Sequence, residues 1–463
     1  MTTIRLLLVG ILLHTTTSFH YQTNSAKAWT YNNNGFTHRK SSSTTSLLMT
    51  ASAGNDNSIV NNNVVLRPSS EDPDAFDSFQ IGSAKVHRYT AESNKDDDDG
   101  AAEYVMWYHG RSQNFDDGLP QLSTGRIGRA VSRNGLQWKK VKEGSLSEDT
   151  TDVSLGLNKD AWWSFDTSHV GLGQVLLPMS TPAIIAQGGV YIMYYMGGNF
   201  EETPLSDYTT AETSSDKTIK GMKLRIGVAL SQDGVSWGRV EGDDSTGACI
   251  VPYDKNDPDQ DHSADLEEEL YCGWPEVAVS MDDDTKEKEN RFLMYYSTMT
   301  KETKEKCIAC AISPDGFRWT KKGICTRPSD EDDGGCARCN VLPKASFQEK
   351  QGWSFTDDGY IMFYEGVSKK DNKHRIMMAE SDDGFEWRKK GIVLDVGTSE
   401  DSWDYGGVGS PHIIRLDDGS MRMYYTGQGG DGTTAIGTAR LYVNDDEDSS
   451  ATWKREQAEF ALN

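Results

Sequence analysis

Acidic side chains next to aromatic residues are the feature of this sequence with the clearest potential for chemistry. Glu276 directly follows a Trp-Pro pair, and an aromatic residue precedes each of Asp77, Asp166 and Asp404. An apolar neighbour raises the pKa of a carboxyl group towards neutrality, which suits a general acid, and an ionised carboxylate beside it can act as base or nucleophile. We therefore predict Glu276 as the general acid and one of Asp77, Asp166 or Asp404 as its catalytic partner.

Each of these carboxylates also has a structural interpretation. Glu276 can instead be salt-bridged or exposed to solvent. The stretches DSFQIGSAKV and DYGGVGSPHI align without a gap, and Asp332 falls in the same place as Asp77 and Asp404. A recurrent Asp in a glycine-rich loop accepts backbone N–H bonds that shape the turn. Both interpretations stay open at the level of the sequence.

Five further residues are predicted to bind a substrate, namely Trp274, His109, Arg111, Glu365 and His412. His109 and Glu365 each follow an aromatic pair, and His412 follows a proline that starts a strand. Copies of the repeat described below differ at both of these positions, which indicates that the positions face an asymmetric partner such as a ligand. Arg111 can bind a carboxylate or phosphate through two N–H groups, and His412 can shuttle a proton. A structural hydrogen bond for His412 and an ion pair for Glu365 are the alternatives.

The elements that must position these residues come from a pattern that occurs five times. In each copy an aromatic pair ends a β-type run, a loop follows, and a run of small residues leads on; four copies then have a Ser-x-Asp/Asn-Gly-x-x-Trp corner. The copies span Trp107–Trp138, Tyr194–Trp237, Tyr295–Trp319, Phe363–Trp387 and Tyr424–Arg440. Leading strands are predicted at Ala84–Tyr89, Pro182–Ala186, Pro275–Val279, Asn340–Ala345 and Pro411–Arg415.

This repeat determines the predicted fold. Alternating residues and Asp-Gly or Asn-Gly turns indicate four antiparallel strands per copy, and no long stretch has a helical period. One copy cannot bury its faces alone, so neighbouring copies must stack, and closing the ring removes the free edges. The sequence therefore predicts an all-β, five-bladed β-propeller with four antiparallel strands per blade, over residues 73–463.

With five blades and this corner, residues 75–455 resemble the five-bladed propellers of the arabinanase, levansucrase and invertase superfamily, which includes glycoside hydrolase families 43 and 32. The resemblance implies a pocket at one end of the central channel, where two carboxyl groups about 5–9.5 Å apart cleave a glycosidic bond. The Asp-Pro and Glu-x-Pro elements that usually start an inner strand in that superfamily are absent from the predicted strand starts. The residues directly before the strand-start proline, or its equivalent, are Ser83, Thr181, Trp274, Arg338 and Ser410.

Two functions therefore stay open. The first is a carbohydrate-active, glycoside hydrolase-like protein that acts through paired carboxylates, and the second is a non-catalytic propeller that binds a glycan or serves as a plastid assembly or scaffold factor. An isomerase or lyase acting on a small metabolite is a third possibility. In each case we expect a carbohydrate or other small-molecule ligand at the channel mouth. The net charge of −24 disfavours nucleic acid and anionic membrane surfaces as partners. No phosphate-binding or dinucleotide motif is present, and we predict no cofactor.

The N-terminal residues have the composition of targeting segments. Arg5 precedes the apolar run Leu6–Leu13, which is too short to span a bilayer and is typical of a signal peptide ending at Ser18. Residues 19–54 are rich in Ser, Thr and Asn and contain no acidic residue, as in a transit peptide, and residues 55–72 are predicted to be a linker. We predict import into a plastid by the secretory route, with secretion as the alternative, and a mature form without a membrane span.

The seven cysteines all lie between Cys249 and Cys339, an odd number without a secreted-domain framework. Cys307 and Cys310 fall three apart on one predicted strand, so their side chains point to opposite faces and no metal site is predicted there. Cys336 and Cys339 lie in a glycine-rich loop and are candidates for a redox pair.

Overall fold

The computed structural model describes ten stretches of the chain. They are residues 63–89, 104–113, 119, 121–141, 153–177, 190–208, 217–279, 292–348, 352–443 and 451–456. All of these residues belong to one unit, Ser46–Asn463. The predicted signal and transit segments lie outside the described residues. Within the described part of the chain, no helix is long and apolar enough to cross a membrane.

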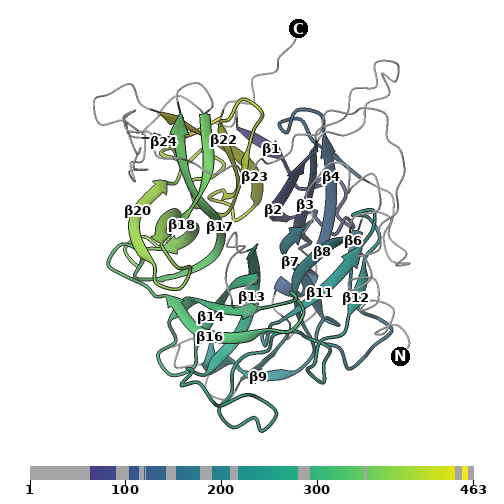
Figure 1. Ribbon diagram of the computed structural model, residues 1–463. Coiled ribbons are helices and arrows are strands. Elements are labelled where there is room, and N and C mark those ends of the chain that lie inside the picture. Colours follow the sequence, from purple (N-terminus) through teal and green to yellow (C-terminus); the bar gives the residue numbers. More distant parts are fainter. Residues whose placement is uncertain are drawn as a thin grey trace, which may run out of the picture. The chain divides into compact units, whose positions relative to one another are not determined.

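Antiparallel strands form five successive meanders, which we number in chain order (Figure 1). The first contains β2 (Gln80–Arg88), β3 (Tyr104–Arg111), β4 (Arg126–Ser132) and β5 (Lys139–Lys140), with β6 (Val153–Leu155) also beside β4. The second contains β7 (His169–Leu176), β8 (Tyr191–Gly198), β11 (Arg225–Ser231) and β12 (Gly238–Val240). The third contains β13 (Glu269–Val279), β14 (Phe292–Thr300), β15 (Lys306–Ser313) and β16 (Thr320–Thr326).

The last two meanders have the same construction. The fourth contains β17 (Gly335–Gln348), β18 (Gly352–Val367), β19 (His374–Ser381) and β20 (Arg388–Leu394). The fifth contains β21 (Gly407–Arg415), β22 (Met421–Gln428), β23 (Thr434–Val443) and β24 (Ala451–Arg455). A short hairpin of β9 (Glu202–Pro204) and β10 (Thr218–Lys220) and the 3₁₀ turns η1 (Gln121–Thr124) and η2 (Leu205–Asp207) complete the described elements. The all-β prediction is confirmed.

The first strands begin earlier than predicted. Each extends several residues before the strand-start position, and in the second meander the first strand is β7, not the predicted Pro182–Ala186, which lies outside the described residues. The predicted linker also contributes a strand, because β1 (Val64–Leu66) pairs with β23. Asn63 strengthens this attachment by donating to the Tyr425 hydroxyl at 2.6 Å and accepting from the Trp403 indole at 2.9 Å.

The aromatic pairs explain why the repeat requires two large side chains in succession. Adjacent residues of a strand face opposite sides of its sheet, so one ring of each pair enters each neighbouring core. Tyr194 packs in the core between the second and third meanders, and Tyr195 packs in the core between the first and second. The other pairs divide in the same way, and a further core lies between the fifth meander and the first. Both faces of each meander are thus covered by neighbours.

The Asp-Gly corners are tied to the same aromatic residues. At the second corner Ser231 Oγ accepts from the Gly234 N–H at 2.8 Å, and Asp233 accepts two further backbone N–H groups. The carbonyl of Gly234, whose φ is +69°, accepts from the Trp107 indole of the first meander at 2.9 Å. Tyrosine hydroxyls make the matching bond at the other three corners. The repeated residues therefore join neighbouring meanders.

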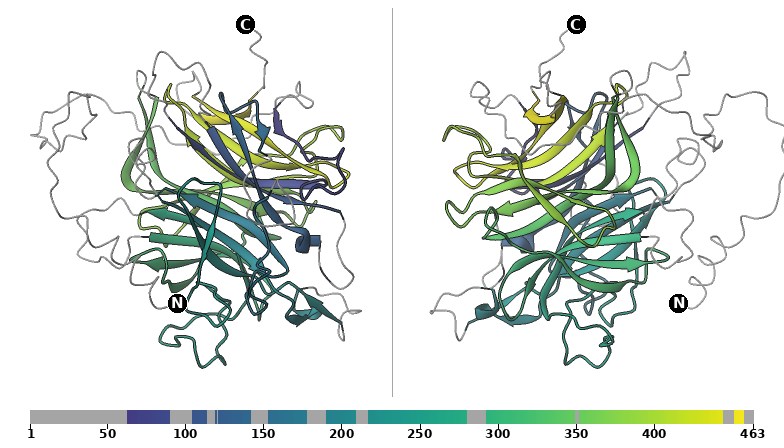
Figure 2. Two further views of the ribbon diagram at one scale, coloured as in Figure 1. Left: turned by 90° about the vertical axis from the view of Figure 1, so that its right-hand side faces the viewer. Right: turned by 60° about the vertical axis from the view of Figure 1, so that its left-hand side comes forward.

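The first strands lie next to one another in a cyclic order. β7 contacts β2 and β13, β17 contacts β13 and β21, and β21 contacts β2. Figure 2 gives two further views of the strands within each meander. Residues at equivalent positions of the five first strands are consequently brought together, and this arrangement positions the candidate site.

Candidate functional site

A bulge at one position of each first strand shapes the site. The ladder between the first and second strands shifts register there in all five meanders. In four of them the bulged residue is not glycine and is left-handed, with φ of 50°, 47°, 43° and 48° at Ser83, Trp274, Arg338 and Ser410. Such backbone is unfavourable for these residue types and is concentrated at functional sites, where bulges redirect side chains.

Side chains of the preceding meander hold three of these bulges. Ser83 N donates to Thr426 Oγ1 at 3.0 Å, Arg338 N to Ser297 Oγ at 2.8 Å, and Ser410 N to Glu365 Oε2 at 3.1 Å. Thr426, Ser297 and Glu365 each directly follow an aromatic pair. Residues at this position differ in type but share the task of accepting the N–H of a bulge, and Glu365 is the acidic member of the set.

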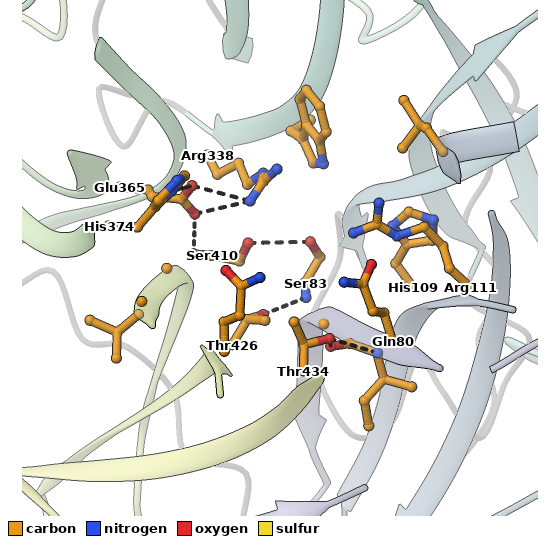
Figure 3. A pocket seen from close by; sticks show the side chains of 18 residues that line it. Gln80, Ser83, His109, Arg111, Arg338, Glu365, His374, Ser410, Thr426 and Thr434 are labelled. Atoms are coloured by element: carbon orange, nitrogen blue, oxygen red, sulfur yellow. Dashed lines mark hydrogen bonds and ion pairs between the residues drawn. The ribbon is translucent and has the colours of Figure 1, made fainter. Parts of the chain in front are cut away.

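All four left-handed residues line one pocket, a cavity of about 180 Å³ (Figure 3). This is less than the ~300–1,000 Å³ of pockets that enclose drug-sized ligands, so the cavity suits one sugar ring or a molecule of similar size. Most of the other lining side chains are polar: Gln80, His109, Arg111, Glu365, His374, Thr426, Gln428 and Thr434. The pocket is therefore rich in hydrogen-bonding groups that both donate and accept.

Glu365 is the single carboxylate among the described residues that line this pocket. It is buried, and it contacts Arg338 Nη1 at 3.1 Å and His374 Nδ1 at 2.5 Å. Burial raises the pKa of Glu365, but Arg338, His374 and the N–H of Ser410 outweigh that effect and hold the pKa at about 2. Glu365 is thus ionised at neutral pH and has no proton to give.

The other side of the pocket contains Arg111 and His109 (Figure 3). Burial, and secondarily the charge of Arg338, lower the pKa of Arg111 to about 10, so the guanidinium stays charged at neutral pH. Burial lowers the pKa of His109 well below its usual value, and the neighbouring arginines lower it further. His109 is consequently neutral, and its Nε2 atom has no hydrogen-bond partner among the described residues.

Glu276 lies outside this pocket, in a buried network that joins all five first strands. Its Oε2 accepts from Lys85 Nζ at 2.7 Å, and its Oε1 accepts from Gln174 at 3.0 Å and from Asn340 at 2.6 Å. Asn340 in turn accepts from the backbone N–H of Ile413 at 2.9 Å. The salt-bridged interpretation of Glu276 is the one that the structure shows.

The divergent position that was predicted to face a ligand thus faces its own counterparts. In the second meander it is occupied by Gln174, not by the predicted Ala183, because β7 is the first strand. His412 of the fifth meander is buried, and its Nε2 contacts the carbonyl of Val86 at 3.1 Å. Burial and the charge of Lys85 lower the pKa of His412 well below its usual value, so it is neutral and has a structural hydrogen bond.

Asp77, Asp166 and Asp404 also lie outside the pocket, each in a buried ion pair within its own meander. Asp166 accepts from the Tyr195 hydroxyl at 2.9 Å and from Arg239 Nε at 2.6 Å. The same triad of an acid before or at the start of the first strand, a tyrosine of the second strand and a cation of the fourth recurs in every meander. The other four are Asp77–Tyr108–Lys140, Glu269–Tyr296–Lys321, Asp332–Tyr364–Lys389 and Asp404–Tyr425–Arg455.

The structure therefore brings together one subset of the predicted site residues. Trp274, His109, Arg111 and Glu365 line the pocket, whereas Glu276, His412 and the three aspartates do not. A catalytic role for those carboxylates stays a prediction, to which the contacts add a structural role for each. The sequence analysis missed Arg338 and His374 as site residues. The position of Arg338 directly before a strand-start equivalent, like that of Trp274, was the available signal.

The cysteines are buried or half-buried free thiols. Cys336 and Cys339 lie on β17 in the core between the third and fourth meanders, and burial raises the pKa of both thiols. A redox pair needs accessible thiolates, which these residues do not supply. In the described stretches no group of three or more His, Cys, Asp or Glu residues is placed to hold a metal ion.

We expect Cys336 and Cys339 to resist iodoacetamide in the folded protein and to react fully in ~6 M guanidinium chloride, because burial and protonation both suppress thiol reactivity. Mass spectrometry of tryptic peptides measures the alkylated fraction of each cysteine. Rapid alkylation of either cysteine under native conditions, or a disulfide that links their two peptides after mild oxidation, would restore the redox interpretation.

Comparison with known proteins supports the fold. Neither a family model nor a curated protein matches the sequence. A solved structure of a complex of BT0996 with RGII is 16% identical, with 82% of the present sequence and 91% of that protein covered and a TM-score of 0.51. A glycosyl hydrolase from Bacteroides ovatus is 14% identical, with 82% and 91% covered and a TM-score of 0.49. A thermostable family-43 glycoside hydrolase is 13% identical, with 81% and 93% covered and a TM-score of 0.47. At this identity the likeness to the first of these structures shows a shared fold and nothing more.

Proposed function

We propose that the chain is a five-bladed propeller that binds a carbohydrate of about one sugar ring in the pocket, without cleaving it through paired carboxylates. The observation that carries this proposal is the composition of the pocket. Four strained bulges from four meanders converge on a cavity lined by hydroxyl, amide and indole groups. Hydroxyl and amide groups match the alternating donors and acceptors of a sugar, and an indole ring covers its apolar face.

The charge state of the pocket argues against the hydrolytic alternative. Cleavage of a glycosidic bond uses one carboxyl group that gives a proton and a second that acts as base or nucleophile. Within the described residues the pocket has one carboxylate, Glu365, and its pKa of about 2 keeps it ionised at neutral pH. Glu276 already bonds Lys85, Gln174 and Asn340. The residues present can therefore hold a sugar but do not form an acid–base pair.

The binding function predicts that Trp274→Leu weakens sugar binding at least about tenfold, the effect expected of a central aromatic residue. Isothermal titration with a panel of neutral and acidic monosaccharides gives the affinity. The matched control is Trp162→Leu, because Trp162 is 86% exposed and does not line the pocket. This variant should bind as the unaltered protein does.

Aryl glycosides test the absence of hydrolysis in parallel. We expect release of the aryl group at the rate of the protein-free blank. Turnover that is lost in Glu365→Gln or Glu276→Gln while the protein stays folded would contradict the proposal and support the hydrolase. Failure of every sugar to bind would contradict the binding function itself and favour the scaffold alternative.

A further inference from the structure

Arg111 is a charged group without a partner among the described residues. Its side chain is half-buried at the end of β3, and in the part of the chain that the structure describes its guanidinium makes neither an ion pair nor a hydrogen bond. A charge removed from water without a counter-charge is costly, and proteins pair such groups or neutralise them. In the five buried triads every cation contacts a carboxylate, whereas Arg111 contacts none among the described residues.

The second arginine of the pocket is only partly engaged. Arg338 stacks on the Trp274 ring at 4.6 Å and bonds Glu365 through Nη1, and Glu365 also bonds His374. Two guanidinium groups therefore face one carboxylate, which leaves one positive charge in the pocket even when His374 is neutral. The protein as a whole has a net charge of −24, so this local excess is opposite in sign to the charge of the protein.

A third arginine, just outside the pocket, adds to the positive charge of this region. Arg126 donates to the carbonyl oxygens of Gly125 at 2.7 Å and Ser123 at 3.3 Å, and no carboxylate among the described residues bonds it. The charges of Arg111 and Arg126 also help to keep His109 and His169 neutral, in addition to burial. The region around the pocket thus disfavours further positive charge and favours an anion.

We propose that the pocket binds the anionic group of an acidic sugar, a carboxylate or a phosphate, with Arg111 as its counter-charge. This inference rests on the proposed sugar binding and narrows its ligand class. Arg111 and His109 lie on one side of the pocket, Arg338 and Glu365 on the other, with the Ser83 and Ser410 hydroxyls between them (Figure 3). An oxyanion against Arg111 receives charge-assisted hydrogen bonds there, and the hydroxyl-bearing part of the ligand meets the serine side chains.

The test compares three probes by isothermal titration, namely glucose, glucuronate and glucose 6-phosphate, with inorganic phosphate as a fourth. We expect at least one acidic sugar to bind about tenfold or more tightly than glucose, as charge-assisted bonds to one guanidinium provide. Arg111→Gln should remove that preference, whereas Arg133→Gln should keep it. Arg133 is exposed in a corner of the first meander and gives the same change in net charge.

Two further measurements separate the sources of the anion. A phosphate gains its second charge near pH ~6, so affinity for glucose 6-phosphate should rise between about pH 5 and 7, while that for glucuronate stays constant. Affinity for either anion should fall as sodium chloride is raised, and affinity for glucose should not. Because removing an unpaired charge relieves its desolvation cost, Arg111→Gln should also melt no lower than the unaltered protein, which shows that a loss of binding is not a loss of fold.

Each outcome decides the inference. Equal affinity for glucose and both acidic sugars, unchanged in Arg111→Gln, overturns it and leaves sugar binding intact. Binding of inorganic phosphate but of no sugar, with loss in Arg111→Gln, retains the anion site and overturns the proposed sugar ligand. Absence of binding by all four probes overturns both.

Discussion

Replacing Glu276 by glutamine is expected to lower the free energy of unfolding by about 3–5 kcal/mol, the range for breaking a buried ion pair. Glu276 is 1% exposed, and its two oxygens accept from Lys85, Gln174 and Asn340. Glutamine has the same shape but places a donor where only acceptors fit, and it leaves Lys85 charged and unpaired. Urea denaturation followed by tryptophan fluorescence measures the change.

The control for this variant is Glu386→Gln, an exposed position whose side chain makes no bond among the described residues. Its free energy of unfolding should change by less than about 0.5 kcal/mol. A double-mutant cycle of Glu276→Gln with Lys85→Met tests whether the lost ion pair causes the destabilisation. If the two residues act as a pair, the free energy of unfolding of the double variant should fall by much less than the sum of the two single decreases. A fully stable Glu276→Gln would contradict the structural role and return Glu276 to the list of candidate acids.

The fold was predictable because each repeated residue type makes a bond or contact that recurs. Aromatic pairs appear in succession because their rings enter two different cores, as Tyr194 and Tyr195 do. The Asp-Gly corner appears because its Ser and Asp side chains accept backbone N–H groups, as Ser231 and Asp233 do. Such local requirements leave a signature in one sequence. The misplaced strand of the second meander was also recoverable, since DTSHVGLGQV aligns with DSFQIGSAKV without a gap.

The site was less predictable because it depends on backbone geometry that the residue types do not signal. Ser83, Trp274 and Arg338 have a left-handed backbone conformation, which these residue types adopt rarely. Their amino-acid types therefore give no indication of a bulge. The bulge places Arg338 in the pocket, while the side chain two positions later, Asn340, turns into the buried network beside Glu276. Divergence between copies was predicted to mark positions that face a ligand. The position of Glu276 and Asn340 lies instead in the buried network, whereas the position of His109 and Glu365 lines the pocket.

The second large effect on stability is expected in the triads. A variant of a triad carboxylate that loses stability but keeps sugar affinity identifies that carboxylate as structural and not catalytic. Asp166→Asn should lower the free energy of unfolding by about 3 kcal/mol or more, because Asp166 is fully buried and accepts from Ser164, Tyr195 and Arg239. Asparagine keeps one acceptor but removes the negative charge that pairs with Arg239. Sugar affinity of the folded fraction should be unchanged, because Asp166 does not line the pocket. Urea denaturation and isothermal titration on the same preparation measure both quantities.

Asp160→Asn is the matched control, since Asp160 lies in the same loop, is exposed, and has no bonded partner among the described residues. Its stability and binding should both match those of the unaltered protein. Arg239→Gln should reproduce the loss caused by Asp166→Asn, and the double variant should lose little more than either single variant because the two residues stabilise the fold as one pair. An Asp166→Asn protein that keeps its stability but loses affinity or turnover would contradict this assignment. The aspartates before the first strands would then have to be treated as functional groups of the site.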